Sequence, residues 1–160
     1  VRLKHLTERL ELCVRAATCQ SPSTILPNLF IGNALVAQSV HTLEKLGITH
    51  VLTLVPDLEL AYPAHFKHLR ISVVDTEDED IAHYFREAAD FVETATKGGG
   101  KALVHCFEGK SRSATMVLAA LMINDQMPMA EAYTLLSSKH PVSPVSTSGD
   151  ALRYADVLSA

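Results

Sequence analysis

Apolar positions recur at helical spacing in several stretches of the chain, and short runs rich in Val, Ile and Leu lie between those stretches. The runs occupy residues 48–55, 67–74 and 101–106, and they predict strands, the first of them buried. Ahead of them, the turn-rich stretch SPSTILPNLFIGNA (21–34) encloses two short apolar pieces. It predicts a small hairpin.

Helices are predicted around these strands, because apolar residues return every three or four positions. The predicted helices span residues 3–18, 34–46, 81–96, 111–125 and 128–138. Thr147 and Asp150 fit a capping box that would open a last helix. Glycine, which is common at helix ends, follows two of the segments at Gly47 and at 98–100.

Strands that alternate with helices predict an α/β fold, in which a mostly parallel central sheet carries helices on both faces. Ligands of such sheets bind at the carboxyl ends of the strands. A length of 160 residues favours one core. We therefore expect one domain over 24–160, with a helix within 1–23 that packs on this domain or flanks it.

Composition and charge exclude several classes of function. The net charge of −4 argues against non-specific nucleic-acid binding, which needs a basic surface. No apolar run approaches the roughly 18 residues of a membrane span, so we expect no membrane insertion. The charged start is unlike a signal peptide, and without an initiator Met the chain is interpreted as an excised domain.

Cysteine and histidine usage bears on the compartment and on metals. Three cysteines, Cys13, Cys19 and Cys106, form an odd and sparse set that fits a reducing compartment. The expected location is the cytoplasm, with the nucleus as the alternative. The histidines lack cysteine or carboxylate neighbours at zinc-site spacing, so we expect no metal and no other cofactor.

The segment HCFEGKSRS, residues 105–113, runs from the end of a predicted strand into a predicted helix. Unpaired backbone N–H groups at such a junction form an anion site together with the helix dipole. The same field favours the thiolate form of Cys106, and Arg112 can hold two phosphoryl oxygens in its planar fork. A thiolate beneath an anion cradle suits in-line attack on phosphorus. The expected phosphate-binding residues are Phe107, Glu108, Gly109, Lys110, Ser111 and Arg112.

The remaining catalytic roles fall on residues beside this loop and on a second loop. We expect His105 to hold the loop and tune the thiolate, and Ser113 to donate a hydrogen bond to the Cys106 sulfur when it leaves. The leaving oxygen needs a general acid. Asp75 fits best, because it directly follows a predicted strand, whereas Asp78 and Asp80 merge into the next helix.

The pattern H-C-x-x-G-x-x-R-S resembles the signature of cysteine-dependent protein phosphatases, and the chain resembles a dual-specificity phosphatase catalytic domain over roughly residues 24–158. The stretches 25–55 and 71–92 resemble the opening hairpin, helix and strand of that family and its acid loop. The resemblance implies Cys106 as nucleophile, Arg112 as phosphate clamp and Asp75 as general acid. It also implies phosphorylated proteins as substrates, with a protein kinase among the candidate partners.

One departure and several alternatives accompany the resemblance. The family usually carries Pro-Asn before its last helix, where this chain has Pro144 and Val145; Ser146 or Thr147 could substitute. Low-molecular-weight phosphatases and arsenate reductases place the same kind of loop near the N-terminus, the reverse of this order. A phosphoinositide or other non-protein phosphatase fits Lys110 but not the residues before it, and a weakly active phosphate-binding module would usually lack a catalytic residue.

Overall fold

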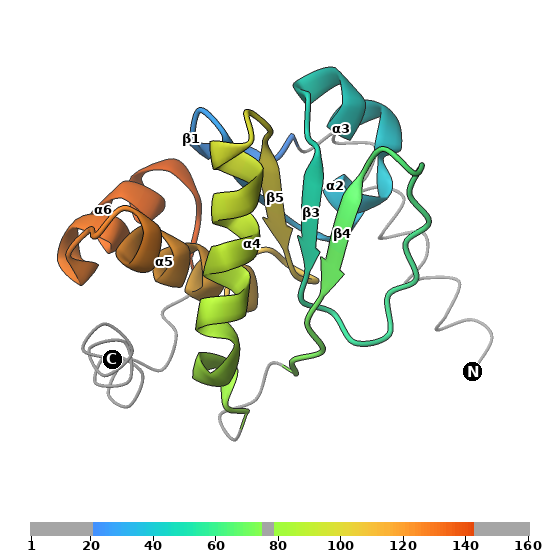
Figure 1. Ribbon diagram of the computed structural model, residues 1–160. Helices are drawn as coiled ribbons and strands as arrows, with labels where there is room; N and C mark the ends of the chain where they lie inside the picture. Colours follow the sequence, from blue (N-terminus) through green and yellow to red (C-terminus); the bar gives the residue numbers. More distant parts are fainter. Residues whose placement is uncertain (1–20, 75–78, 143–160) are drawn as a thin grey trace.

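The computed structural model describes residues 21–74 and 79–142 (Figure 1). Five strands form one sheet there, in the order β1-β2-β5-β3-β4. The strands are β1 (Ser23–Leu26), β2 (Leu29–Gly32), β3 (His50–Thr53), β4 (Lys67–Arg70) and β5 (Ala102–His105). β1 and β2 form the predicted antiparallel hairpin, and the other neighbours are parallel. The predicted mostly parallel sheet is confirmed, although the strands are shorter than the apolar runs.

The helices correct two of the predicted segments. The described helices are α2 (Ala34–Gln38), α3 (Val40–Leu46), η1 (Ile81–Tyr84), α4 (Phe85–Lys97), α5 (Arg112–Asn124) and α6 (Met129–Lys139). The predicted helix 34–46 breaks at Ser39, because this residue leaves helical geometry and its side chain caps α3 by accepting from the Thr42 amide. The predicted helix 81–96 begins with a 3₁₀ turn. The helices predicted at 3–18 and after Thr147 lie outside the described residues.

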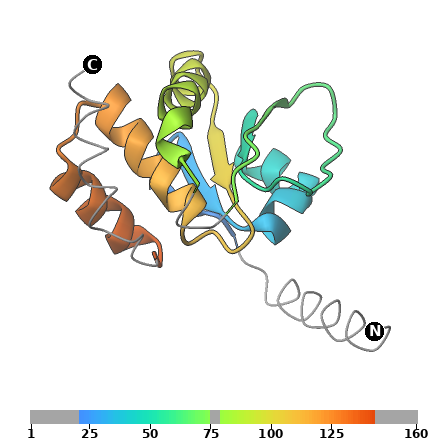
Figure 2. The ribbon, with the colours of Figure 1, turned by 90° about the horizontal axis from the view of Figure 1, so that it is seen from below.

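Helices cover both faces of the sheet, as predicted (Figure 2). α4, α5 and α6 lie on one face, and α5 packs between the other two. α2 and α3 cover the opposite face, where Phe30, Val51 and Leu103 form a smaller core with them. From Ser113 to Met122 every residue of α5 is buried. This helix is therefore anchored along its length. Its burial also fixes the end of the loop that leads into it.

The register of the strands brings their carboxyl ends to one level. Gly32 and Thr53 both pair with His105, and Thr53 also pairs with Arg70. The segments that follow β2, β3, β4 and β5 consequently start side by side at one edge of the sheet. This is the edge at which ligands bind in parallel sheets.

Among the residues that the structure describes, none of the helices is both long and apolar enough to cross a membrane.

Candidate active site

The loop 106–111 joins β5 to α5 and packs on the junction between β2 and α2. The Ala34 amide donates to the Phe107 carbonyl over 3.1 Å. Gly109 adopts a φ of +77°, and a Cβ at this position would lie 2.7 Å from the Gly32 carbonyl oxygen. Only glycine satisfies both the left-handed conformation and this close approach. The conformation of the loop therefore depends on Gly109, as the sequence indicated.

The Cys106 sulfur lies inside the turn of this loop. The side chain is a free thiol and is buried. The Gly109 amide donates to Sγ over 3.1 Å, and the Ser113 hydroxyl lies 3.2 Å from Sγ. Two donors aimed at one sulfur stabilise negative charge on it, whether before attack or on departure. The predicted proximity of Ser113 to the sulfur is present in the structure.

Arg112 is the first residue of α5, and its side chain crosses to the loops after β3 and β4. Its Nη1 donates to the Leu54 and Val73 carbonyls, each over 3.0 Å. Its Nε is buried and lacks a hydrogen-bond partner within the described part of the chain. A buried guanidinium donor left unpaired is costly. The guanidinium is thus held on one side by the backbone, and Nε remains available to donate to an anionic ligand.

His105 lies at the end of β5 and is tied to the next two strands by hydrogen bonds. Its Nδ1 donates to the Cys106 carbonyl over 3.3 Å, because a carbonyl only accepts. Its Nε2 must then accept from Thr53 Oγ1, 2.7 Å away, and Thr53 in turn accepts from His68 Nε2 over 2.8 Å. Burial lowers the pKa of His105 to about 4, so the ring is neutral at physiological pH. This chain of bonds holds the backbone beside Cys106.

The other predicted phosphate-binding residues line the mouth of the loop. Phe107 is half exposed, and Glu108 and Lys110 are exposed. The latter two side chains border a cavity of about 320 Å³, together with Asn33 and His140. The loop therefore presents one carboxylate and one ammonium group to solvent. Its backbone, not these side chains, forms the interior around the sulfur.

The general acid predicted at Asp75 lies outside the described residues, as does its competitor Asp78. Asp80 directly precedes η1 and is exposed. Val73, whose carbonyl Arg112 binds, lies two residues before Asp75. The segment that leads to the predicted acid is thus tied to Arg112. The assignment of Asp75 stays a prediction.

Sequence reasoning missed three residues that support the loop. Asn33 caps α2 by accepting from the Val36 amide over 3.0 Å, Thr53 binds His105, and His140 Nε2 contacts the Gly109 carbonyl. Asn33 had a recognisable signal, since an Asn before a helical run is a common N-cap. Thr53 and His140 carry no signal of their own, because they reach the loop through the tertiary fold.

No group of three histidine, cysteine, aspartate or glutamate side chains able to hold a metal ion occurs in residues 21–74 and 79–142. The hydrogen-bond donors nearest the Cys106 sulfur are the Gly109 amide and the Ser113 hydroxyl, and with the Arg112 guanidinium they suit an anionic ligand.

Comparison with known proteins places this geometry in a family. Residues 29–148 match the family model described as dual specificity phosphatase, catalytic domain. The chain belongs to this family. The match spans β2, the segment that contains Asp75 and the Cys106 loop, and it leaves out only residues 25–28 of the stretches that carry the sequence resemblance.

Curated relatives of this phosphatase domain are longer than the chain. Dual specificity protein phosphatase PHS1 of Arabidopsis thaliana is 46% identical over 144 residues, which are 88% of this chain and 16% of that protein. MAP kinase phosphatase with leucine-rich repeats protein 3 of Dictyostelium discoideum is 39% identical over 121 residues, or 75% of this chain and 14% of that protein. The chain spans only a small part of these relatives.

A solved structure shares the fold of this phosphatase domain. A mouse putative dual specificity phosphatase, crystallised as a complex with zinc tungstate, superposes with a TM-score of 0.80 at 27% identity. The superposition covers 88% of this chain and 89% of that one.

Proposed function

We propose that this domain hydrolyses phosphotyrosine, phosphoserine and phosphothreonine in proteins through a phosphocysteine intermediate on Cys106. One observation carries the proposal: the Cys106 sulfur accepts from the Gly109 amide and lies beside the Ser113 hydroxyl, inside a loop that ends at Arg112. The amide and the hydroxyl can both donate to sulfur that carries negative charge, which a covalent phosphoryl carrier needs when its bond to phosphorus breaks.

The reaction proceeds in two displacements on phosphorus. In the first, the Cys106 thiolate forms a bond to phosphorus, and the bond from phosphorus to the side-chain oxygen of the substrate breaks. That oxygen takes a proton from the general acid, which we assign to Asp75. In the second, water gives a proton to the Asp75 carboxylate and its oxygen bonds to phosphorus, the bond from phosphorus to sulfur breaks, and inorganic phosphate is released. Ser113 and the Gly109 amide then donate to the departing thiolate. Arg112 and the loop amides hold the phosphoryl oxygens throughout.

The unpaired Nε of Arg112 supports this role for the guanidinium. Nη1 is already occupied by the Leu54 and Val73 carbonyls, and these bonds fix the plane of the guanidinium group. A phosphoryl oxygen would supply the acceptor that Nε lacks. Lysine has no planar fork and cannot satisfy both requirements at once.

The substrate class is tested by comparing phosphate release from a phosphopeptide panel with release from soluble phosphoinositides. We expect turnover of phosphotyrosine, phosphothreonine and phosphoserine peptides, all lost in Cys106→Ser. Faster hydrolysis of phosphoinositides than of every peptide would replace the protein substrate with a lipid headgroup and give Lys110 the role of a lipid-phosphate contact. Cys106-dependent anion binding without turnover would indicate a phosphate-binding module.

Residues that flank the phosphorylated side chain should be neutral or basic. Glu108 is exposed on the loop 106–111, and the run DTEDED at 75–80, which follows β4 in the sequence, is expected to border the cleft, so both would add negative charge there. Screening over about 8 Å in physiological salt limits this repulsion to close neighbours. Peptides with neutral or basic flanks should therefore show a higher kcat/KM than matched acidic ones, with a gap that shrinks as salt rises. A preference for acidic flanks would contradict this.

The acid is assigned by the dependence of the rate on the leaving group. Asp75→Asn should slow aryl phosphates with poor leaving groups by about 10²–10⁴-fold and those with good leaving groups much less, because only poor leaving groups need the proton. The variant should also lose the basic limb of the pH–rate profile. The same pattern in Asp78→Asn would move the assignment to that residue.

The proposed substrate class also bears on the partner of this domain and on the compartment in which it acts. A relative named as a MAP kinase phosphatase is similar to 75% of this chain. A phosphorylated protein kinase is therefore the first candidate substrate, in a signalling role and in the cytoplasm or nucleus. Dephosphorylation of a kinase activation-loop peptide, measured against a shuffled phosphopeptide, tests this choice; equal rates would remove the preference.

A further inference from the structure

The end of α6 is joined to the catalytic loop through His140, the residue that follows the helix. His140 Nδ1 lies 2.7 Å from the Ser23 hydroxyl on β1, and His140 Nε2 contacts the Gly109 carbonyl. The ring is half-buried and borders the 320 Å³ cavity beside the loop. One imidazole thus spans two parts of the fold, the first strand and the loop that carries the nucleophile.

The direction of these bonds follows from chemistry alone. The Gly109 carbonyl can only accept, so His140 Nε2 carries the hydrogen. In the neutral ring, Nδ1 then accepts from the Ser23 hydroxyl. A protonated ring would donate from both nitrogens, and the Ser23 oxygen can accept as well. The bond from His140 to the loop therefore persists in either protonation state.

The bond to the Gly109 carbonyl constrains the peptide group that follows. In a planar trans peptide the carbonyl and the next N–H point in opposite directions. Because the Gly109 carbonyl points toward His140, the Lys110 N–H must point away from His140. The peptide before it is held separately, since the Gly109 N–H donates to Cys106 Sγ.

Glycine makes such a restraint necessary. Gly109 lies at φ +77°, and without a Cβ its backbone moves more readily than that of any other residue type. We infer that His140 is a positioning residue, which fixes the 109–110 peptide so that the Lys110 amide faces the bound phosphoryl group. This role rests on the proposed phosphatase function of the Cys106 loop.

The neighbouring residue provides a matched control. Lys139 Nζ donates to the Ile25 carbonyl over 3.0 Å, so it also ties the end of α6 to β1. This bond is with β1 and not with the loop. Lys139→Met should loosen α6 against β1 and leave the loop peptide in place.

The test compares tungstate binding by calorimetry in four variants, with thermal unfolding measured beside it. His140→Ala should weaken tungstate binding about 3–10-fold, the loss expected when one amide of an anion site is no longer oriented. His140→Gln, whose amide nitrogen can donate at a similar distance, should recover most of the affinity. Lys139→Met should bind tungstate as the wild type does, even if its melting temperature falls. His140→Leu, which fills the space without donating, should behave as His140→Ala and replaces it if the alanine variant does not fold.

Equal tungstate affinity in His140→Ala and Lys139→Met, or glutamine and leucine variants that bind alike, would overturn the positioning role. The proposed function has a separate readout, the Cys106-dependent turnover of an aryl phosphate by the wild type. If the wild type hydrolyses the aryl phosphate and the His140 variants bind tungstate as tightly as the wild type, only the inference about His140 is removed. Absence of turnover would remove the phosphatase proposal, and the calorimetric comparison would still decide the role of His140.

Discussion

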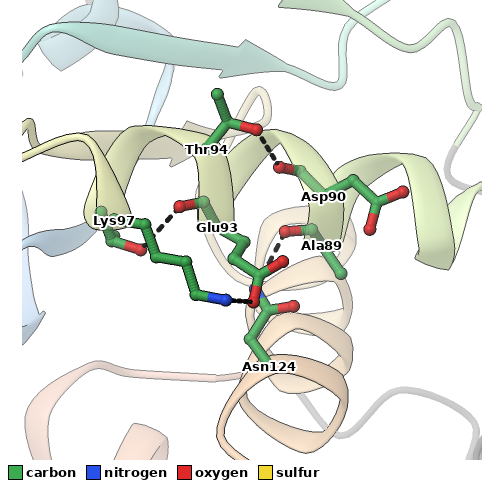
Figure 3. Close-up of polar contacts among 7 residues, drawn as sticks. Ala89, Asp90, Glu93, Thr94, Lys97 and Asn124 are labelled. Atoms are coloured by element: carbon green, nitrogen blue, oxygen red, sulfur yellow. Dashed lines mark hydrogen bonds and ion pairs between the residues drawn. The ribbon is translucent and has the colours of Figure 1, made fainter.

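The carboxyl end of the sheet and α4 both have backbone carbonyls that side chains bind, but the two regions differ in what those bonds constrain. On α4, Thr94 donates to the Asp90 carbonyl and Asn124 of α5 donates to the Ala89 carbonyl, over 2.8 and 2.9 Å (Figure 3). These carbonyls belong to a regular helix. The geometry of this helix does not depend on the two added side-chain bonds.

At the catalytic loop, side chains bind the backbone of segments without helix or strand geometry. Arg112 holds the carbonyls of Leu54 and Val73, and His105 holds that of Cys106. Without these bonds the loops have no ladder of their own to keep them in place. We conclude that bonds of similar length matter more for function here than on α4, and four predictions measure that difference.

The largest effect is expected for Cys106→Ser. A serine hydroxyl is a poor nucleophile and a poor leaving group here, so turnover of any phosphate ester should fall by about 10³-fold or more. Tungstate binding should persist, because the loop amides and Arg112 remain. Phosphate release from an aryl phosphate measures turnover, and calorimetry measures tungstate binding. Activity within tenfold of the wild type would show that Cys106 is not the nucleophile.

Arg112→Lys should reduce kcat/KM by about 10²–10³-fold, the usual consequence of removing a preorganised donor to transition-state charge. Lysine keeps the charge but cannot bind the Leu54 and Val73 carbonyls and a phosphoryl oxygen together. Arg70→Lys is a suitable control, because Arg70 also binds carbonyls of a loop, those of Pro56 and Leu58, but is exposed. Similar losses in both variants would refute a special role for Arg112.

The third effect is on stability and depends on pH. The pKa of His105 in the folded protein is about 4, below its ordinary value of 6.5, because burial penalises the charged ring. The unfolded chain therefore binds this proton first as the pH falls. The stabilisation is complete above about pH 6.5 and is lost toward pH 4, at up to about 1.4 kcal/mol per pH unit for this one group.

Urea unfolding at several pH values between 4 and 7.5 measures this loss, and His105→Asn is the comparison, because asparagine does not titrate. The difference in slope between wild type and variant isolates His105 from His50 and His68, whose pKa values burial also lowers. Parallel slopes would mean that His105 protonates without cost in the folded state.

The smallest effect is expected at the ion pair on α4. Lys97 Nζ lies 2.6 Å from Glu93, but its side chain is 75% exposed (Figure 3). Exposed i,i+4 pairs contribute about 0.3–0.5 kcal/mol. Lys97→Met should therefore change the unfolding free energy by less than about 0.5 kcal/mol and leave kcat/KM unchanged. A marked loss of activity would show that the side-chain contacts of α4 affect the loop 106–111, contrary to expectation.

The sequence predicted those parts of the site that are local. The nine residues 105–113 contain the strand end, the turn glycine, the nucleophile and the arginine, and their spacing alone indicates an anion-binding loop. The boundaries of α5 were predicted to within one residue, because polar residues flank its apolar run at both ends. The hairpin was predicted from its turn residues.

The parts that could not be predicted depend on distant contacts. Thr53 and His105 are 52 positions apart, and His140 and Gly109 are 31 apart. No local pattern indicates that these side chains meet. The break at Ser39 was missed for another reason, since a serine that accepts from the backbone competes with helix continuation while the apolar spacing runs on unchanged.

The central claim is that Cys106 carries the phosphoryl group, and trapping that group tests it most directly. The wild-type protein is mixed with a phosphopeptide, quenched in strong denaturant within the first turnover and digested with trypsin, which cuts after Lys101 and Lys110. Mass spectrometry should find one phosphoryl group on the sulfur of the 102–110 peptide, and none in Cys106→Ser. Phosphate release at the normal rate with no phosphoryl group on this peptide, or with the group on another residue, would contradict the account.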